Sequence, residues 1–401
     1  MSTYGLEGAL AWSQAFHVAT AAGQRLPPVA ARLDEAGGNV LARDLVLLTD
    51  DPACDCAAVD GFAICGEGPW LGVNDDRLRP GECKHLLRGQ PIPDHTDAVI
   101  SYDQAQAREA SDGTLVVIAI DELTGVIDEA ARPPLGTGIT RQAGRARVGA
   151  QLVPAGRLVT PSVLALAAAT GHDTVEIIRP PVVGTLVLGH ALLSQGLPRD
   201  GRARDALGEA VAMFAGMHGA RSNPPLRAPD TARLLLEHMD DANVDVLITT
   251  GSTAPTPDNH VRQVLRDLGA RWLIDGVAST PGAQMLLARL PDGRLIVGLP
   301  GEPASAIAGL VTIVAPLLAG MRGAEPPRTT TATLIDEVPP GEYVEDTRLV
   351  PVHLEKSGGN TIARLLPAGV EHLGGLANAD GVAVIAPGAG NRGEAVPVLP
   401  V

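Results

Sequence analysis

The chain has 401 residues, a formal net charge of −15 and only 2% aromatic residues. This length exceeds what one hydrophobic core usually holds, so we expect two to four domains. The negative charge repels polyanions, and the scarcity of aromatic rings removes the surfaces on which bases stack. Composition therefore excludes a general nucleic-acid-binding protein.

No segment has the pattern of a membrane span or a metal site. The longest uncharged apolar stretch, residues 306–321, has 16 residues and contains Pro316, whereas a span needs roughly 20. The first residues lack the basic and apolar pattern of a signal peptide, so we expect a cytoplasmic protein. The cysteines lack the paired C-x-x-C spacing of zinc sites, which favours reduced thiols at Cys54, Cys56, Cys65 and Cys83.

The first part of the chain changes character twice. Apolar residues recur four positions apart between residues 5 and 22, which predicts a helix that Pro27 and Pro28 stop soon afterwards. Short β-type runs broken by Gly, Pro and Asp follow from about 45 to 145 and predict an inserted β-rich module. Residues 145–180 are mixed, with a strand-like run and then a helix from Pro161 to Gly171.

Strand-like and helix-like runs alternate from residue 182 to residue 325. The predicted strands are 182–189, 243–251 and 294–300, and the predicted helices are 205–218, 231–241, 260–269 and 302–320. This alternation favours an α/β domain with a parallel sheet and helices on both faces. After Pro326 and Pro327 come five short strand-like runs and no helix-like run, which predicts a small β-barrel or sandwich.

Two loops follow strands of the predicted sheet at their carboxyl ends, where open parallel sheets bind ligands. The first is ITTGSTAPTPDNH, residues 248–260, which has no Lys or Arg; the second is GLPGEPASA, residues 298–306. Glycines permit close approach of a ligand, and the free amides of a first helical turn attract anions. The candidate binding residues are Gly251, Ser252, Thr253, Asp258, Gly298, Pro300, Gly301 and Ser305.

Motifs in order along the whole chain resemble those of the molybdopterin molybdenumtransferase (MoeA) family, which includes the E domain of gephyrin. AAVDGFAI (57–64) is similar to S-A-V-D-G-Y-A, and GQPIPDHTDAVISYD (89–103) to G-x-P-x-P-x-G-x-D-A-V-V. DVLITTGS (245–252) stands for D-V-V-I-T-S-G-G, and GLPGEPASA for G-L-P-G-N-P-V-S-A. A L-V-P-A-G segment (152–156) and the tail around 372–387 also resemble the family.

This resemblance implies a multidomain α/β fold and an elongated homodimer. It implies an N-terminal elongated, dimer-forming subdomain (1–44 with 145–180), an inserted β-rich subdomain (45–144), a molybdopterin-binding-like α/β subdomain (181–325) and a C-terminal β-barrel (326–401). In the family, a cleft takes adenylylated molybdopterin and molybdate, and a divalent cation, Mg²⁺, helps to release AMP. Asp60 and Asp245 match family positions and are the candidate catalytic residues.

Other charged positions of the family are replaced. Gly-Glu-Asp reads Gly144, Arg145 and Ala146; Thr-Gly-Asp-Glu-Leu reads Leu188, Gly189, His190, Ala191 and Leu192; and Lys-Pro-Gly-Lys reads Thr280, Pro281, Gly282 and Ala283. Arg88 occupies a position that is usually Thr in the family, Asn259 one that is usually acidic, and Glu302 one that is usually Asn. A charged hydrogen bond contributes about 1.5 to 3 kcal/mol, so loss of both lysines should weaken anion binding. Two arginine clusters, Arg141, Arg145 and Arg147 and then Arg199, Arg202 and Arg204, either compensate or are solvated surface.

Two hypotheses follow. The first is a gephyrin-like dimeric scaffold that has lost molybdenum insertion, needs no cofactor and presents its surface to a partner peptide. That partner would be a cell-division protein in an actinobacterium or a membrane receptor. The second is a divergent molybdenumtransferase that uses Mg²⁺, adenylylated molybdopterin and molybdate, with the arginine clusters, Asp60, Asp245 and Asp258 in place of the usual set. Complementation of a strain lacking the transferase discriminates between them.

Overall fold

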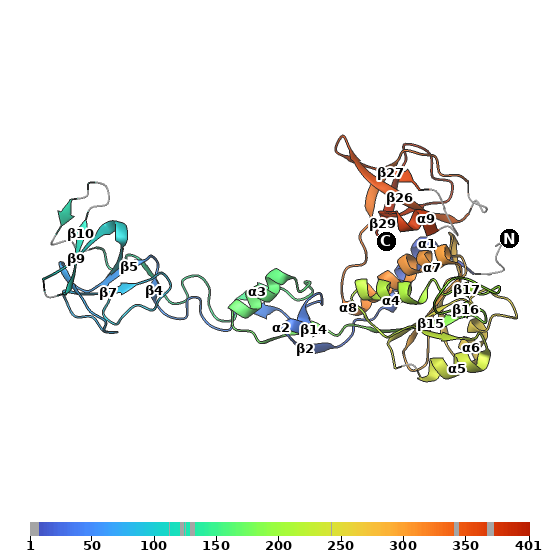
Figure 1. Cartoon of the computed structure of the whole chain (residues 1–401), viewed down its shortest axis with the longest axis horizontal. Helices are drawn as coiled ribbons and strands as arrows, with labels where there is room; N and C mark the ends of the chain where they lie inside the picture. The colour runs from blue at the N-terminus through green and yellow to red at the C-terminus, as the bar shows by residue number, and fades with distance from the viewer. Residues whose placement is uncertain are drawn as a thin grey trace. The chain divides into compact units, whose positions relative to one another are not determined.

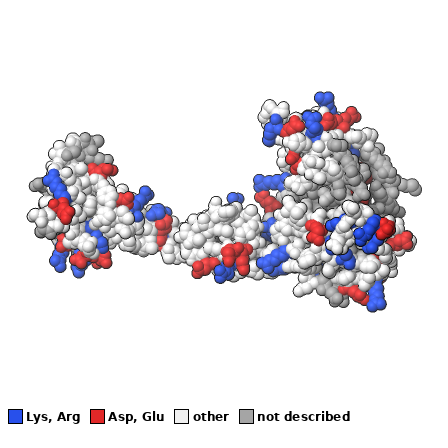
Figure 2. Space-filling model, viewed as in Figure 1, with Lys and Arg blue, Asp and Glu red and all other residues white. Residues whose placement is uncertain are grey.

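The computed structural model describes residues 8–111, 113–120, 124, 126–128, 133–241, 243–340, 345–366 and 373–401. Two compact units divide the chain (Figure 1). One comprises Met1–Arg43, Ala155–Pro161 and Thr174–Val401, and the other comprises Asp44–Pro154 and Ser162–Asp173. On the face shown in Figure 2, Lys and Arg side chains are interspersed with Asp and Glu, so neither unit presents a continuous basic surface there.

The unit around Asp44–Pro154 contains the predicted β-rich module. Its main sheet runs in the order β11 (Ile127–Asp128), β10 (Leu115–Ile120), β6 (Trp70–Gly72), β7 (Glu82–Leu86), β5 (Gly61–Ile64) and β8 (Ala98–Ser101), with β9 (Ala105–Glu109) paired to β10. Short pairs add β3 (Leu45–Val46) with β13 (Gln151–Val153) and β4 (Cys56–Ala57) with β12 (Ile139–Thr140). Trp70 is fully buried at the centre of this module. The helix predicted to begin at Pro161 is α3 (Pro161–Ala169).

The larger unit is built around a seven-stranded sheet. Its order is β18 (Arg221–Ser222), β15 (Val182–Leu188), β20 (Val246–Thr250), β24 (Leu295–Leu299), β23 (Leu286–Arg289) and β21 (Arg271–Asp275), with β19 (Leu226–Ala228) also on β15. The first four strands of this order, together with β19, are parallel. β23 and β21 are antiparallel. The three strands predicted from the sequence are therefore parallel as expected, and residues 271–289 add two antiparallel strands that the sequence did not predict.

Helices cover both faces of this sheet, as predicted. α4 (Gly208–Met217) and the helix Pro303–Arg322 pack on one face, where Phe214, Val297 and Leu317 share a core. α5 (Ala232–Asp241) and α6 (Val261–Asp267) pack on the other, where Leu235 and Leu265 are fully buried. The predicted N-terminal helix is α1 (Trp12–Ala22), which joins the first face; residues 5–7 of that prediction lie outside the described part.

The helix Pro303–Arg322 is continuous but not uniform. It consists of α7 (Pro303–Gly309), a π-helical turn (Leu310–Val314) and α8 (Ala315–Arg322), and it ends at Gly323, whose φ of 63° stops the helix. Within the π turn, the hydroxyl of Thr312 accepts a 2.9 Å hydrogen bond from Trp12 of α1. Of the described helices, this one alone is long and apolar enough to span a bilayer, yet 83% of its most apolar window is buried in the protein.

The C-terminal strands form the predicted barrel. β25 (Thr330–Leu334), β29 (Ala395–Leu399), β28 (Gly381–Ile385), β26 (Thr347–Ser357) and β27 (Asn360–Leu365) pair in sequence, and β27 returns to β25, which closes the barrel. Outside the closed barrel, β22 (Val277–Thr280) pairs with the start of β26, and β1 (Leu10–Ala11) pairs with β22. A short helix, α9 (Leu373–Ala377), corrects the expectation that no helix follows Pro327. Elsewhere in the unit, β2 (Pro28–Arg32) pairs with β14 (Thr174–Ile178), and α2 spans Leu33–Ala36.

Candidate functional site

Four chain segments meet at the carboxyl edge of the parallel strands. They follow β19, β15, β20 and β24, and β15 lies between β19 and β20, where the chain changes direction across the sheet. Such a switch point is where open α/β sheets bind ligands. The loops after β20 and β24 touch: a Cβ placed on Gly301 would lie 3.3 Å from the Cα of Gly251. This edge is the candidate site.

The loop after β20 has an unusual backbone at its start. Gly251 has a φ of 87°, and a side chain there would lie 3.0 Å from the carbonyl oxygen of Leu188. Ser252 has a φ of 60°, a left-handed conformation that non-glycine residues rarely adopt. Its hydroxyl accepts a 2.8 Å hydrogen bond from the backbone amide of His260, so the two ends of the loop are joined. Asp258 lies exposed in the turn between them.

Buried contacts fix the base of this loop. Thr253 is only 2% exposed, and its methyl group fills the space beside Gly298 in β24. Arg262 of α6 donates a 2.7 Å hydrogen bond to the carbonyl oxygen of Thr253 and pairs with Asp275. Burial lowers the pKa of Arg262 to about 10, so it remains charged at neutral pH. The loop is therefore held from below by a buried cation.

The loop after β24 does not leave its helical amides free. The carboxylate of Glu302 accepts hydrogen bonds from the backbone amides of Ala304, at 3.0 Å, and Ser305, at 2.6 Å. Pro300 is buried beneath the loop and Gly301 is exposed. The expectation that the first turn of α7 presents open amides to an anion was thus wrong, because the chain's own carboxylate caps them.

An apolar cavity of about 340 Å³ adjoins this loop. It lies between α7 and the barrel, and Ile307, Leu349 and Val382 line it. Thr280, which stands at a position of the family's first lysine, also lines the cavity, and its hydroxyl donates a 2.9 Å hydrogen bond to Asp346. Glu302 is the one ionisable side chain among the cavity's lining residues in the described part of the chain.

Asp245 is remote from this edge. It precedes β20, whereas the loop follows it, and five residues of strand span roughly 17 Å. Its carboxylate accepts two 2.8 Å hydrogen bonds from the guanidinium of Arg179 and one from the amide of Val182. Burial raises the pKa of Asp245, but these hydrogen bonds outweigh burial and hold it below its ordinary value. We therefore correct its expected catalytic role to a structural one.

Asp60 and the first arginine cluster belong to the other compact unit. Asp60 lies just before β5 and accepts a 2.7 Å hydrogen bond from the amide of Arg88. Arg141 pairs with Asp55 at 2.6 Å and Arg145 with Asp51 at 3.5 Å, so two charges of the cluster are neutralised within their own unit. Hydrogen bonds from the Gln142 amide and from Arg141 lower the pKa of Asp55, which keeps it ionised. Arg147 is exposed.

The second arginine cluster lies in the segment after β15. There β16 (Leu192–Leu193) pairs with β17 (Ala203–Arg204), and the turn between them brings the backbones of Arg199 and Arg202 together. Arg202 and Arg204 donate 3.2 Å hydrogen bonds to the carbonyl oxygens of Leu192 and Gly196. All three arginines are exposed, and within the described part none of them forms an ion pair.

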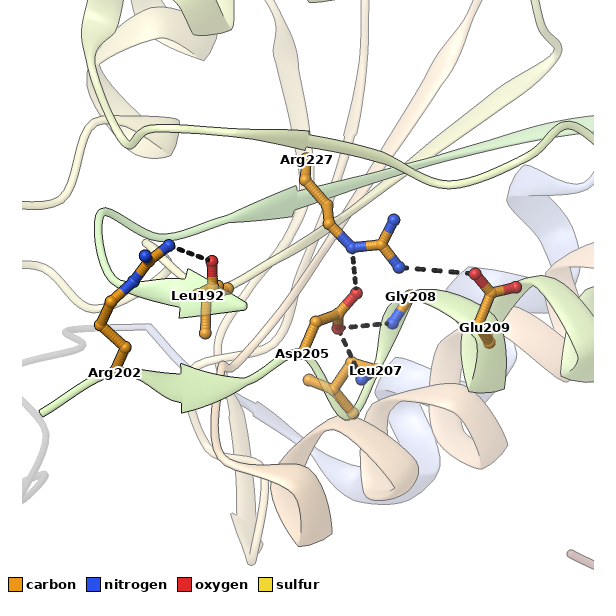
Figure 3. Close-up of polar contacts among 7 residues, drawn as sticks. All are labelled: Leu192, Arg202, Asp205, Leu207, Gly208, Glu209 and Arg227. Carbon is orange, nitrogen blue, oxygen red and sulfur yellow. Dashed lines mark hydrogen bonds and ion pairs between the residues drawn. The ribbon is translucent and has the colours of Figure 1, made fainter. Parts of the chain in front are cut away.

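Asp205 and Glu209, the acids that follow this cluster in the chain, already have a partner. Arg227 pairs with Asp205 at 2.7 Å and also reaches Glu209, as Figure 3 shows. Asp205 further accepts 2.9 Å hydrogen bonds from the amides of Leu207 and Gly208. Residues 199–204 carry three arginines and only Asp200 as an acid. An excess of positive charge therefore remains at the carboxyl end of β15.

The sequence did not predict three features of this edge. One is a hydrogen bond of 3.1 Å between Nδ1 of His260 and Oδ1 of Asp230, whose carboxylate is nearly buried. The others are the Arg262 anchor and the Glu302 cap. Only the cap has a local signal, since Pro303 suits the first helical position and thereby places Glu302 at the N-cap. The other two join residues 13 and 30 positions apart.

The chain's own residues do not fit the divalent cation that the resemblance implies. Across the described ranges, no three His, Cys, Asp or Glu side chains are grouped so as to hold a metal ion. Cys56, Cys65 and Cys83 are buried and Cys54 is exposed, all as free thiols. Burial raises the pKa of Cys83 to about 12, which suits a core residue and not a ligand or nucleophile.

Two family models match the sequence. The MoeA N-terminal region, domains I and II, matches residues 9–171, and the probable molybdopterin binding domain matches residues 182–320. Between them the two models cover well over half of the chain.

Curated relatives and solved structures are similar along most of the chain. The molybdopterin molybdenumtransferase of Bacillus subtilis is 27% identical over 386 residues, covering 90% of this chain and 86% of that protein. The one from Staphylococcus aureus strain Mu50 is 24% identical over 340 residues, covering 78% and 76%. The molybdopterin biosynthesis MoeA protein of Pyrococcus horikoshii superposes with a TM-score of 0.76 at 20% identity, covering 98% and 99%. At that identity the likeness demonstrates a shared fold.

Proposed function

Because the chain belongs to the family of MoeA molybdopterin molybdenumtransferases, we propose that it binds adenylylated molybdopterin and transfers molybdate to it during molybdenum cofactor assembly. This is the second of the two hypotheses drawn from the sequence. The relatives bearing that name match this chain over both the N-terminal region and the α/β domain.

The observation that carries the proposal is the unpaired positive charge after β15. The family's lysines are absent, yet Arg199, Arg202 and Arg204 stand at the same edge of the sheet, exposed and without ion pairs within the described residues. A guanidinium binds a phosphoryl group through two parallel N–H donors, so arginine suits this ligand at least as well as lysine. In this proposal the arginines hold the phosphate groups, and the loop after β20 lies against the ligand.

Each element of the edge has a distinct task in this account. Arg262 keeps the loop after β20 in place through Thr253, and the contact between Gly251 and Gly301 joins the loops after β20 and β24. The apolar cavity beside α7 excludes water from that side of the site. The Glu302 carboxylate repels an anion placed directly at α7, which directs the phosphates toward the arginines after β15.

The test is release of AMP from adenylylated molybdopterin by the purified chain, measured by chromatography with and without molybdate. We expect molybdate-dependent release. Arg202→Gln combined with Arg204→Gln should lower kcat/KM about a hundredfold, because each lost charged hydrogen bond contributes about 1.5 kcal/mol. Arg233→Gln is the matched control, since Arg233 is an exposed arginine that pairs with Glu237 on α5.

The scaffold hypothesis makes the opposite prediction for the same assay. It derives from the loss of the family's acids and lysines, and it predicts no AMP release by the wild-type chain at any molybdate concentration. Release that is unchanged in the double arginine variant would leave the activity standing and overturn the role given to the arginines.

A further inference from the structure

His260 and Asp230 form a pair of titratable side chains at the carboxyl edge, separate from the arginines after β15. His260 follows the loop after β20, and Asp230 follows β19, so the pair crosses the end of β15, which lies between these strands. Nδ1 of the imidazole lies 3.1 Å from Oδ1 of the carboxylate. The Asp230 side chain is 11% exposed and the His260 side chain 28% exposed. The nearly buried carboxylate of Asp230 is therefore hydrogen-bonded to the His260 imidazole, which remains partly exposed to solvent.

The pairing determines which ring nitrogen is available. A carboxylate accepts hydrogen bonds, so Nδ1 of His260 carries a proton toward Asp230, and Nε2 is the nitrogen left for a ligand. Among the described residues Nε2 has no hydrogen-bond partner. Nε2 becomes a donor as well when the ring takes up a second proton on contact with an anion. The contact with Asp230 thus fixes Nε2 as the ring nitrogen that can contact a ligand.

The backbone holds His260 independently of its ring. Its amide donates a 2.8 Å hydrogen bond to the Ser252 hydroxyl, and Ser252 keeps a left-handed φ of 60°. Such a conformation is strained for a non-glycine residue and persists only where its surroundings enforce it. Because this contact uses the main chain, replacing the imidazole leaves the loop's closure intact.

Other charged groups on the segments around His260 are committed elsewhere or point to solvent. Arg262 on α6 binds Thr253 and Asp275, and Arg233 on α5 pairs with Glu237. Arg227 on β19 pairs with Asp205 and Glu209. Asp258, in the same loop as His260, is exposed. Asp230 is therefore the acid that acts directly on the imidazole.

We propose that His260, positioned by Asp230, binds a phosphoryl oxygen of the ligand through Nε2–H. The proposal rests on the proposed function. It adds a second phosphate contact to the arginines after β15, and this contact comes from the loop after the neighbouring strand β20. The ligand class is a phosphate ester or anhydride. His260 is the contacting residue, and Asp230 is a positioning residue.

The experiment uses AMP as the probe and adenosine, which lacks the phosphate, as its counterpart. Calorimetric titration at neutral pH should show that His260→Gln weakens AMP binding about tenfold, the equivalent of roughly 1.4 kcal/mol, and leaves adenosine binding unchanged. Asp230→Asn should weaken AMP binding about fivefold. His353→Gln is the matched control, because His353 forms a similar pair with Asp380 in the barrel, at 2.5 Å.

Proton uptake separates a charged contact from a merely structural one. Titration in buffers of different ionisation enthalpy should show that AMP binding takes up a proton in the wild-type chain and not in His260→Gln. Equal AMP affinity and equal proton uptake in the two proteins would overturn the proposal, and so would a wild-type chain that binds no AMP. If AMP binds through His260 but no AMP is released from adenylylated molybdopterin, the proposed function fails and this inference stands.

Discussion

At the scale of single residues, the pair of Asp245 and Arg179 shows how a family aspartate can serve the fold. Three hydrogen bonds converge on this carboxylate, which joins the segment before β15 to the start of β20. Asp245→Asn should lower the free energy of unfolding by about 2 kcal/mol at neutral pH, because it weakens charged hydrogen bonds in a partly buried place. Glu237→Gln, in an exposed pair on α5, should cost less than 0.5 kcal/mol.

The pKa of Asp245 determines how its contribution to the free energy of unfolding changes with pH. The folded pKa of Asp245 is held below its ordinary value of 3.8, so its contribution is present above that value and is lost as the pH falls through the folded pKa. The difference in stability between wild type and Asp245→Asn, measured by urea unfolding, should therefore shrink only below about pH 4. A difference that is constant from pH 7 to pH 3 would contradict the assignment.

The sequence alone indicated which charged residues of the family are absent. It did not indicate which residues lie at the site in their place. The missing lysines at Thr280 and Ala283 are visible by position alone. The pairing of His260 with Asp230 is not, because it joins the ends of two strands that are neighbours of β15 only in the folded sheet. Asp245 matches a family position in sequence, yet it lies before β20 and the candidate site lies after that strand. A match in residue type alone therefore did not place it at the site.

Among the secondary-structure elements, α8 and the C-terminal end of α1 approach so closely that glycine is required at Gly320 in α8 and at Gly23, just after α1. A Cβ at Gly320 would lie 2.6 Å from the carbonyl oxygen of Gly23, which is backbone that cannot move aside. Gly320→Ala should lower the free energy of unfolding by about 3 kcal/mol through overpacking. Gly216→Ala in α4 is the matched control, because nothing lies within 4 Å of the added methyl group, and it should stabilise the helix by about 0.5 to 1 kcal/mol.

The measurement is the midpoint of urea unfolding for the two variants. Similar shifts for Gly320→Ala and Gly216→Ala would contradict the close packing of α1 on α8.

Elements with long buried runs were predictable, and those with short or mixed patterns were not. β15, β20 and β24 are almost wholly buried and read as continuous apolar runs, as central parallel strands do. β21 to β23 are four or five residues each, and a register shift between Trp272 and Ile274 interrupts the alternation, so their pattern is weak. α9 has five residues, too few for a helical period to be recognised.

In the molecule as a whole, residues 9–171 and 182–320 match the models of the family's N-terminal region and molybdopterin binding domain, and a closed barrel follows them. The sequence could predict this architecture because each domain has its own pattern of periodicity. It could not place the positive charge of the site, since the arginines after β15 occupy a loop with no family motif. We expect this positive charge to support the transfer of molybdate.

Complementation of a strain that lacks its own molybdenumtransferase shows whether it does. Expression of the wild-type chain at normal molybdate should restore nitrate reductase activity, and the Arg202→Gln, Arg204→Gln variant, produced at the same level, should restore little of it. A soluble, folded wild-type chain that restores no activity would contradict the account and favour a protein that has kept the fold without the reaction.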